Sequence, residues 1–354
     1  MRDLEEMLRQ AVEQEAADIF IVSGGPVCCK VGRQFMPLDP EFVKPPVSEA
    51  LIRRIYELGS RQMEKLLESG DDDFSFAIAG LARFRVSTYK QRGSLAAVIR
   101  VIAFGIPDYR ELGIPDEVME VASLRKGMVL VTGPAGSGKS TTQACIIDRI
   151  NATRTDHIIT LEEPIEYLHR NKKSIVSQRE VELDSRNYVT GLRACLRQAP
   201  DVILVGEMRD QETIRTAMTA AETGHLVIST LHTMGAANTI DRVIDGFPPE
   251  QQQQIRIQLS MMLHSVISQQ LVPTVDGGLT LAVEVMHVNS AIRTMIREAK
   301  IHQIDSVIAA SSNQGMRSMD ASLTELVKAG RIEKVTALRC AANPDLLQKR
   351  LALL

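Results

Sequence analysis

The chain has 354 residues, 44% of them hydrophobic, and a formal net charge of −3, which predicts a soluble protein with enough apolar side chains for two cores. No apolar run approaches the roughly 18 residues of a membrane span, and the acidic start MRDLEEMLRQ is unlike a signal peptide, so we expect a cytoplasmic protein. The five cysteines form no C-x-x-C pair, and the near-neutral charge with few aromatic residues disfavours direct nucleic-acid binding.

Residues 1–103 mix helix-like and strand-like runs. Leu4 and Leu8 recur at helical spacing, and Ile19–Val22 has the composition of a short strand. The runs Phe84–Tyr89 and Ala96–Ile102 are typical of a hairpin or of two successive antiparallel strands. Together these runs indicate an N-terminal α+β domain.

Residues 104–119 are expected to form a linker, because glycines and prolines alternate there with charged residues. Beyond it, apolar strands alternate with helical stretches, which predicts an α/β domain over residues 120–354 with a mostly parallel sheet covered by helices on both faces. Residues 290–354 have the pattern of helices and form its C-terminal part. The expected strands are Met128–Val131, His157–Leu161, Val202–Val205 and Leu226–Leu231.

The segment GPAGSGKSTT fits the phosphate-binding pattern G-x-x-x-x-G-K-[ST], with Gly133, Gly138, Lys139 and Ser140 in register. It follows an apolar strand and precedes a predicted helix, so backbone N–H groups and the positive end of the helix face the phosphates. We expect Lys139 to reach the β- and γ-phosphates and Ser140 to offer its hydroxyl to Mg²⁺. The residues expected to bind ATP are Gly133, Pro134, Ala135, Gly136, Ser137, Gly138, Lys139, Ser140 and Thr141.

Polar residues follow three of the predicted strands, where an open parallel sheet binds its ligands. Glu162 and Glu163 follow the second strand, Glu207 follows the third, and His225 and His232 flank the fourth. A helix N-cap or first-turn acid is an equally open interpretation for Glu163, and likewise for the nearby Glu166. A structural hydrogen bond is equally open for His225.

Hydrolysis of a γ-phosphoryl bond needs Mg²⁺, a group that orients water, and cations that offset the developing charge. We expect Glu162 to orient the attacking water and Glu207 to contact the Mg²⁺ shell, partly through water. His232 is expected to contact or sense the γ-phosphate. ATP and Mg²⁺ are therefore the expected ligands.

Four segments together resemble the secretion-ATPase superfamily and, within it, the PilT-type retraction motors of type IV pili. They are the phosphate loop, TLEEPIEYLH (Thr160–His169), VGEMRDQETI (Val205–Ile214) and AAETGHLVISTLHT (Ala220–Thr233). AIRTMIRE (Ala291–Glu298) and GMRSMDASLTELVKAGRI (Gly315–Ile332) are similar to the C-terminal signatures of these motors. Assembly and type II secretion ATPases usually carry a four-cysteine metal site, which the cysteines here do not supply.

The resemblance implies a PAS-like N-terminal domain joined to a RecA-like P-loop ATPase domain with C-terminal helices, working as a homo-hexamer. It implies that Arg83, Arg85 and Arg100 reach the phosphates, although an ordinary solvated face also explains arginines that alternate on strands. Residues 112–115 resemble the adenine-side contact. The implied partner is a platform protein of the inner membrane, so that any membrane association is peripheral and through partners.

The sequence departs from the family pattern at several positions. Ala135 replaces a threonine, Glu163 stands where aspartate is usual, and Thr294 and Met295 replace Asn-Leu. One added methylene moves the Glu163 carboxylate by about 1.5 Å, which exceeds the roughly 0.5 Å tolerance of catalytic groups and is compatible with slower turnover.

The leading hypothesis is an ATPase motor that powers pilus retraction, known as twitching motility, by disassembling the pilin filament. The main alternative is a nucleotide-gated adaptor ring that hydrolyses ATP weakly and modulates a second motor. A related ATPase for secretion or DNA uptake is the third hypothesis.

Overall fold

The computed structural model describes residues 2–32, 34–102 and 105–353, and the chain folds into two units. Unit 1 comprises Met1–Gly105 with Glu166–Leu168, and unit 2 comprises Ile106–Ile165 with His169–Leu354. The predicted boundary is the linker over residues 104–119, and residues 103 and 104 at its start lie outside the described residues.

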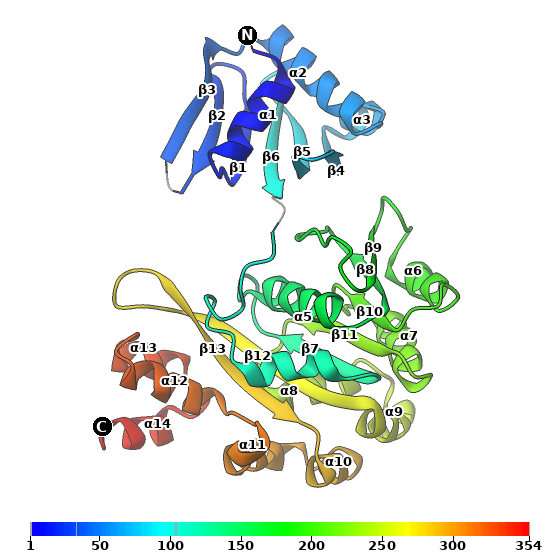
Figure 1. Ribbon diagram of the computed structural model, residues 1–354, viewed down its shortest axis with the longest axis vertical. Coiled ribbons are helices and arrows are strands. Elements are labelled where there is room, and N and C mark those ends of the chain that lie inside the picture. Colours follow the sequence, from blue (N-terminus) through cyan, green and yellow to red (C-terminus); the bar gives the residue numbers. More distant parts are fainter. Residues whose placement is uncertain (1, 33, 103–104, 354) are drawn as a thin grey trace. The chain divides into compact units, whose positions relative to one another are not determined.

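Unit 1 is built on a six-stranded antiparallel sheet in the order β3-β2-β1-β6-β5-β4. Helices pack on this sheet, and Leu8 and Ile55 are among the apolar side chains buried in its core. The predicted N-terminal antiparallel α+β fold is therefore confirmed (Figure 1). The elements are α1 (Leu4–Glu13), β1 (Asp18–Ile21), β2 (Pro26–Val31), β3 (Gln34–Phe42), α2 (Pro45–Leu58), α3 (Glu64–Ser69), β4 (Asp71–Ile78), β5 (Ala82–Gln91) and β6 (Ser94–Ile102).

The hairpin predicted near the end of unit 1 is present. β5 and β6 pair with Gln91 opposite Ser94, so that Arg92 and Gly93 alone connect them. These two residues have φ values of 46° and 75°. Positive φ at both positions of a two-residue loop matches the right-handed twist of the strands.

A buried carboxylate ties the helices of unit 1 to its sheet. Asp72 on β4 is 2% exposed. It accepts hydrogen bonds from the Tyr56 hydroxyl at 3.0 Å and from Arg61 Nε and Nη2 at 2.9 and 2.8 Å, and Lys65 Nζ lies 3.3 Å away. Because each carboxylate oxygen has a partner, the charge is compatible with burial.

Unit 2 is built on a seven-stranded sheet in the order β13-β12-β7-β11-β10-β8-β9, and neighbouring strands are parallel except β12 and β13. The predicted mostly parallel sheet is confirmed. Its strands are β7 (Gly127–Thr132), β8 (His157–Glu162), β9 (Ile175–Glu180), β10 (Val202–Val205), β11 (Leu226–Leu231), β12 (Leu263–Pro273) and β13 (Leu279–His287). Its helices are α4 (Asp116–Met119), α5 (Lys139–Thr153), α6 (Tyr188–Cys195), α7 (Gln211–Glu222), α8 (Ala236–Asp245), α9 (Pro249–Met262), α10 (Ser290–Arg297), α11 (Ile304–Ala310), α12 (Met319–Lys328), α13 (Lys334–Cys340) and α14 (Pro344–Leu351), with short 3₁₀ helices η1 (Glu120–Ser123), η2 (Ile301–Gln303) and η3 (Ser312–Gln314).

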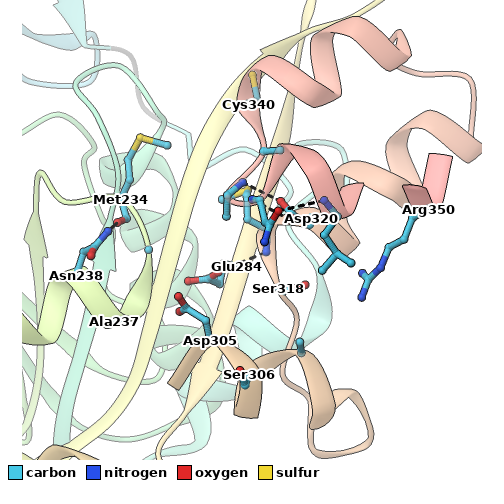
Figure 2. Close-up of a pocket in the computed structure, with 17 residues that line it drawn as sticks. Met234, Ala237, Asn238, Glu284, Asp305, Ser306, Ser318, Asp320, Cys340 and Arg350 are labelled. Atoms are coloured by element: carbon cyan, nitrogen blue, oxygen red, sulfur yellow. Dashed lines mark hydrogen bonds between the residues drawn. The ribbon is translucent and has the colours of Figure 1, made fainter. Parts of the chain in front are cut away.

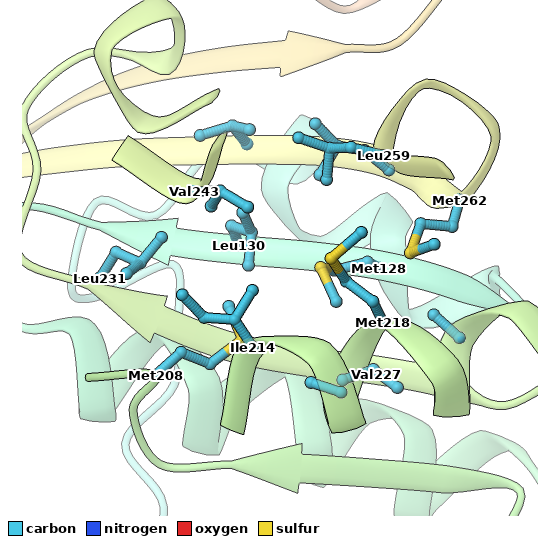
Figure 3. Close-up of a cluster of buried hydrophobic side chains, with 14 of the residues drawn as sticks. Met128, Leu130, Met208, Ile214, Met218, Val227, Leu231, Val243, Leu259 and Met262 are labelled. Atoms are coloured by element: carbon cyan, nitrogen blue, oxygen red, sulfur yellow. The ribbon is translucent and has the colours of Figure 1, made fainter. Parts of the chain in front are cut away.

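Alternate residues of the central strands supply cores on the two faces of this sheet. Met128 and Leu130 of β7 pack with α7, α8 and α9 (Figure 3), whereas Val129 and Val131 pack with α4 and α5. Strands that are buried on both faces carry continuous apolar runs, which explains why the sequence indicated them clearly.

α10 and α11 extend the core around α7, α8 and α9. α12, α13 and α14 form a smaller core with Val272 of β12 and Ala282 of β13. Tyr109 and Ile114, from the segment expected to be a linker, are buried in the core that contains α5. Among the described residues, no helix is long and apolar enough to cross a membrane.

We expect Asp72→Asn to lower the free energy of opening around β4 by about 2 kcal/mol at pH 7, because the partly exposed Arg61 and Lys65 lose a buried partner. Burial raises the pKa of Asp72, but hydrogen bonds from Arg61 and Tyr56 outweigh it and hold the pKa below 3.8. The carboxylate therefore stabilises the fold above pH 3.8, and this contribution is lost as the pH falls through the lowered pKa. Hydrogen exchange of β4 amides measures the cost, and an equal cost at all pH values would contradict this assignment.

Candidate active site

The phosphate loop connects β7 to α5 and is shaped by glycines. Gly133 has φ +141°, and a Cβ added to it would lie 2.1 Å from the main-chain oxygen of Gln269 on β12. Gly138, with φ +84°, is the N-cap of α5. The side chain of Gln269 donates from Nε2 to the carbonyl oxygen of Ser137 at 2.7 Å. The loop is therefore seated directly on β12.

Lys139 is the first residue of α5 and is 9% exposed. Its Nζ donates to the carbonyl oxygens of Gly133 and Pro134, both at 2.9 Å. The ammonium group thus lies against the loop, at the helix end where backbone N–H groups and the helix dipole favour an anion. This arrangement is that of a nucleotide phosphate site.

His232 links Lys139 to Glu207. Lys139 Nζ lies 3.5 Å from His232 Nδ1, and His232 Nε2 lies 3.2 Å from Glu207 Oε2. Because an ammonium group only donates, Nδ1 accepts, and Nε2–H donates to the carboxylate. Burial lowers the pKa of His232, and the charges of Lys139 and Arg209 lower it further, so the ring is neutral at pH 7.

The strand order explains this row of side chains. β11, which ends before His232, lies between β7 and β10, which ends shortly before Glu207. β8, which ends at Glu162, is the next strand outward. Since the carboxyl ends of parallel strands meet at one edge, the four predicted groups gather along this edge, with Glu162 at its far end from the loop.

Glu162 is held by two neighbours on one oxygen. Thr160 Oγ1 donates to its Oε1 at 2.6 Å, and Gln178 Nε2 on β9 donates to the same oxygen at 3.1 Å. The register of β8 and β9 places Thr160 opposite Gln178, so the two donors converge. This geometry fixes the direction of the carboxylate, as a group that orients water requires.

Sequence reasoning missed three residues of this site. Gln178 orients Glu162, Gln269 supports the loop, and Arg209 forms an ion pair with Glu207. Of the three, Arg209 was accessible from the sequence, because it follows Glu207 by two residues in VGEMRD.

Ser140 and Glu207 suit the magnesium role predicted for them. The Ser140 hydroxyl is on the first turn of α5, and the Glu207 side chain is 14% exposed at the same sheet edge. Within the described part of the chain, no group of three His, Cys, Asp or Glu side chains forms a metal cage. Mg²⁺ at phosphate loops takes one or two protein oxygens with phosphate and water, which this donor set matches.

The other polar candidates lie elsewhere. Arg83 and Arg85 on β5 and Arg100 on β6 belong to unit 1, and Arg100 Nε contacts Asp18 at 3.0 Å. Their contact with phosphates stays a prediction. His225 Nδ1 lies 2.9 Å from the carbonyl oxygen of Ala220, at the amino end of β11 and so away from the site, which supports its structural interpretation.

Neither Glu163 nor Glu166 begins a helix, so a first-turn role does not apply to them. Both side chains are exposed. The role of Glu163 in turnover therefore stays a prediction.

The chain is similar to known secretion and pilus ATPases over almost its full length. A family model described as "Type II/IV secretion system protein" matches residues 1–328. The chain is 43% identical to "Type IV pilus retractation ATPase PilT" of Pseudomonas aeruginosa, over 97% of this chain and 99% of that one, and 36% identical to "Type IV pilus ATPase PilU" of the same organism, over 97% and 90%. A crystal structure of the pilus retraction motor PilT with bound ADP superposes with a TM-score of 0.90 at 44% identity, covering 99% of both chains.

Gly133→Ala is expected to abolish nucleotide binding and to cost about 3 kcal/mol of stability, because the new methyl group meets the Gln269 oxygen and the positive φ is strained. Gly136→Ala is the matched control. Gly136 also has positive φ, but nothing lies within 4 Å of an added Cβ, so about 1 kcal/mol is expected. Urea unfolding and ADP titration measure both variants. Equal losses of stability and of ADP binding would show that the positive φ, and not the contact with Gln269, explains the effect.

Proposed function

This chain belongs to the type II/IV secretion system protein family, and on that basis we propose that it is a Mg²⁺-dependent ATPase motor that powers retraction of type IV pili. The observation that carries the proposal is the connected row Lys139–His232–Glu207 at the phosphate loop. It occurs in a chain that aligns over almost its full length with a retraction ATPase.

In this proposal the loop amides and Lys139 bind the β- and γ-phosphates of ATP, and the amino end of α5 adds its dipole. Ser140 and Glu207 would hold Mg²⁺, which would offset the negative charge of the phosphates when bound. His232 contacts both Lys139 and Glu207. Its hydrogen bonds would therefore respond to whether a phosphate occupies the loop.

Glu162 orients the attacking water. Thr160 and Gln178 hold one of its oxygens, so the carboxylate is already oriented in this structure. In-line attack then depends on positioning, which is the main contribution that proteins make to phosphoryl transfer.

The proposal includes Arg83, Arg85 and Arg100 as cations for the phosphates. Its support is the register of β5 and β6, which sets Arg85 directly opposite Arg100. Asp18, which lies opposite Arg100 on β1 at 3.0 Å, offsets part of this positive charge, so an anionic ligand would meet two arginines that are only partly neutralised.

We further propose a homo-hexamer in the cytoplasm that acts on a platform protein at the inner face of the membrane, and associates with the membrane only through such partners. The resemblance to the retraction motors implies the ring, and the relatives named as type IV pilus ATPases support the pilus machine as its setting. Light scattering of the purified protein tests the hexamer.

Glu162→Gln is expected to keep ATP binding and to lower kcat by at least about 100-fold, because an amide is a poor substitute for a carboxylate that orients water. Lys139→Ala is expected to lose binding as well. Glu212→Gln is the control, since Glu212 forms an exposed ion pair on α7. Single-turnover hydrolysis measures all three. Wild-type turnover slower than one event in many minutes would favour the adaptor ring.

Deletion of the gene is expected to leave cells with excess surface pili that no longer retract, because filaments are still assembled. Electron microscopy counts the pili and twitching assays measure retraction. Complementation with wild type restores both, and complementation with Glu162→Gln does not. Cells without any pili would contradict a retraction role and indicate an assembly motor.

A further inference from the structure

The segment that carries His232 ends at a helix with no side-chain N-cap bond. α8 begins at Ala236, after Gly235 with φ +84°. Two residues of the neighbouring hairpin accept from the amides at the helix start: Gly235 N donates to Ser268 Oγ on β12, and Ala236 N donates to Glu284 Oε1 on β13, both at 2.8 Å. The register places Ser268 opposite Glu284, so together they form one docking point for the start of α8.

Glu284 bridges two helices. Its second oxygen, Oε2, accepts from the amide of Met319 at 3.4 Å, and Met319 is the first residue of α12. The residue is 5% exposed. Burial raises the pKa of Glu284. The amides of Ala236 and Met319 oppose this rise, and the charges of Asp305 and Asp320 add to it. Two helix amino ends, each carrying a partial positive charge, thus meet at one carboxylate.

A cavity of about 450 Å³ adjoins this carboxylate. Figure 2 shows Glu284 between Ala237 on α8 and Ser318, which precedes α12. Because open space lies beside the side chain, its hydrogen bonds rather than close packing on all sides hold it in place. The position of the α8 start therefore depends on the two acceptor oxygens of Glu284.

Hydrogen bonds connect the start of α8 to the active site. Thr233, next to His232, forms a hydrogen bond with Thr239 of α8 at 2.8 Å between the two Oγ1 atoms. Thr239 Oγ1 in turn lies 3.4 Å from Thr132 Oγ1, at the end of β7 and next to the phosphate loop. A displacement of the α8 start would therefore move His232 relative to Lys139 and Glu207.

We propose that Glu284 is a positioning residue for the ATPase reaction, which sets the place of His232 by holding the start of α8 between β13 and α12. The inference rests on the proposed ATPase function. It also assigns the C-terminal helices a role at the active site, because α12 shares the same carboxylate.

Glu284→Gln tests the proposal, because the amide keeps the size of the side chain but presents an NH₂ donor to one of the two backbone donors. Asp320→Asn is the matched control. Asp320 is also buried beside the cavity and accepts two amides, from Ala342 at 2.8 Å and Asn343 at 3.1 Å, but these belong to the C-terminal segment alone.

Both variants are expected to lose a similar amount of thermal stability. Only Glu284→Gln is expected to lower kcat, by about 10-fold or more, with ADP affinity unchanged. In a His232→Ala background, Glu284→Gln is expected to change kcat by less than about two-fold, because coupled residues are not additive. A kcat for Glu284→Gln equal to that of Asp320→Asn, or effects that multiply in the double variant, would overturn the inference.

One further measurement, applied also to a second variant, keeps the test of Glu284 separate from the test of the proposed ATPase function. The Cε1–H NMR signal of His232, identified by its loss in His232→Ala, is expected to shift at constant pH in Glu284→Gln and to stay in Asp320→Asn. This NMR measurement needs no catalysis. A wild type that does not hydrolyse ATP would overturn only the proposed ATPase function. A His232 signal that does not move in Glu284→Gln would overturn only the role of Glu284. Ser268→Ala, which removes the partner of Gly235, is the second variant if Glu284→Gln does not fold, and is expected to shift the same signal.

Discussion

The close approach of β12 to the phosphate loop is the constraint on which the site depends. The main-chain oxygen of Gln269 occupies the place where a side chain at position 133 would stand, and its side chain holds the carbonyl of Ser137. The loop therefore takes its shape from a strand more than a hundred residues away in sequence. Glycine at position 133 follows from this contact and from its φ of +141°, in addition to any need of the phosphates.

Three consecutive residues of β12 contact three different parts of unit 2. Gln269 contacts the phosphate loop, Ser268 accepts from Gly235 ahead of α8, and Gln270 donates to the carbonyl of Cys340 at the end of α13. Side chains alternate along a strand, so Gln269 projects to one face and its two neighbours to the other. One strand thus joins the phosphate loop, the His232 segment and the C-terminal helices through direct hydrogen bonds.

The parts of the fold that the sequence predicted best are those with continuous apolar runs. β10 and β11 have the predicted bounds, because each is buried on both faces and flanked by polar turns. β12 was not predicted, since Ser265, Ser268 and Gln269 interrupt its apolar pattern although all three are buried. Their burial is made possible by partners distant in sequence, which local periodicity does not reveal.

The residues of the site that the sequence predicted are those that follow apolar strands. Lys139, Glu207 and His232 each follow an apolar strand, and parallel strands end at one edge, so their meeting follows from the strand order alone. The contact of Gln178 with Glu162 depends instead on the register of β9 beside β8, and a shift of one residue would turn Gln178 to the other face. Groups placed by strand ends are therefore accessible from sequence, whereas the residues that orient them are fixed by register, and register is set by the packing of the whole sheet.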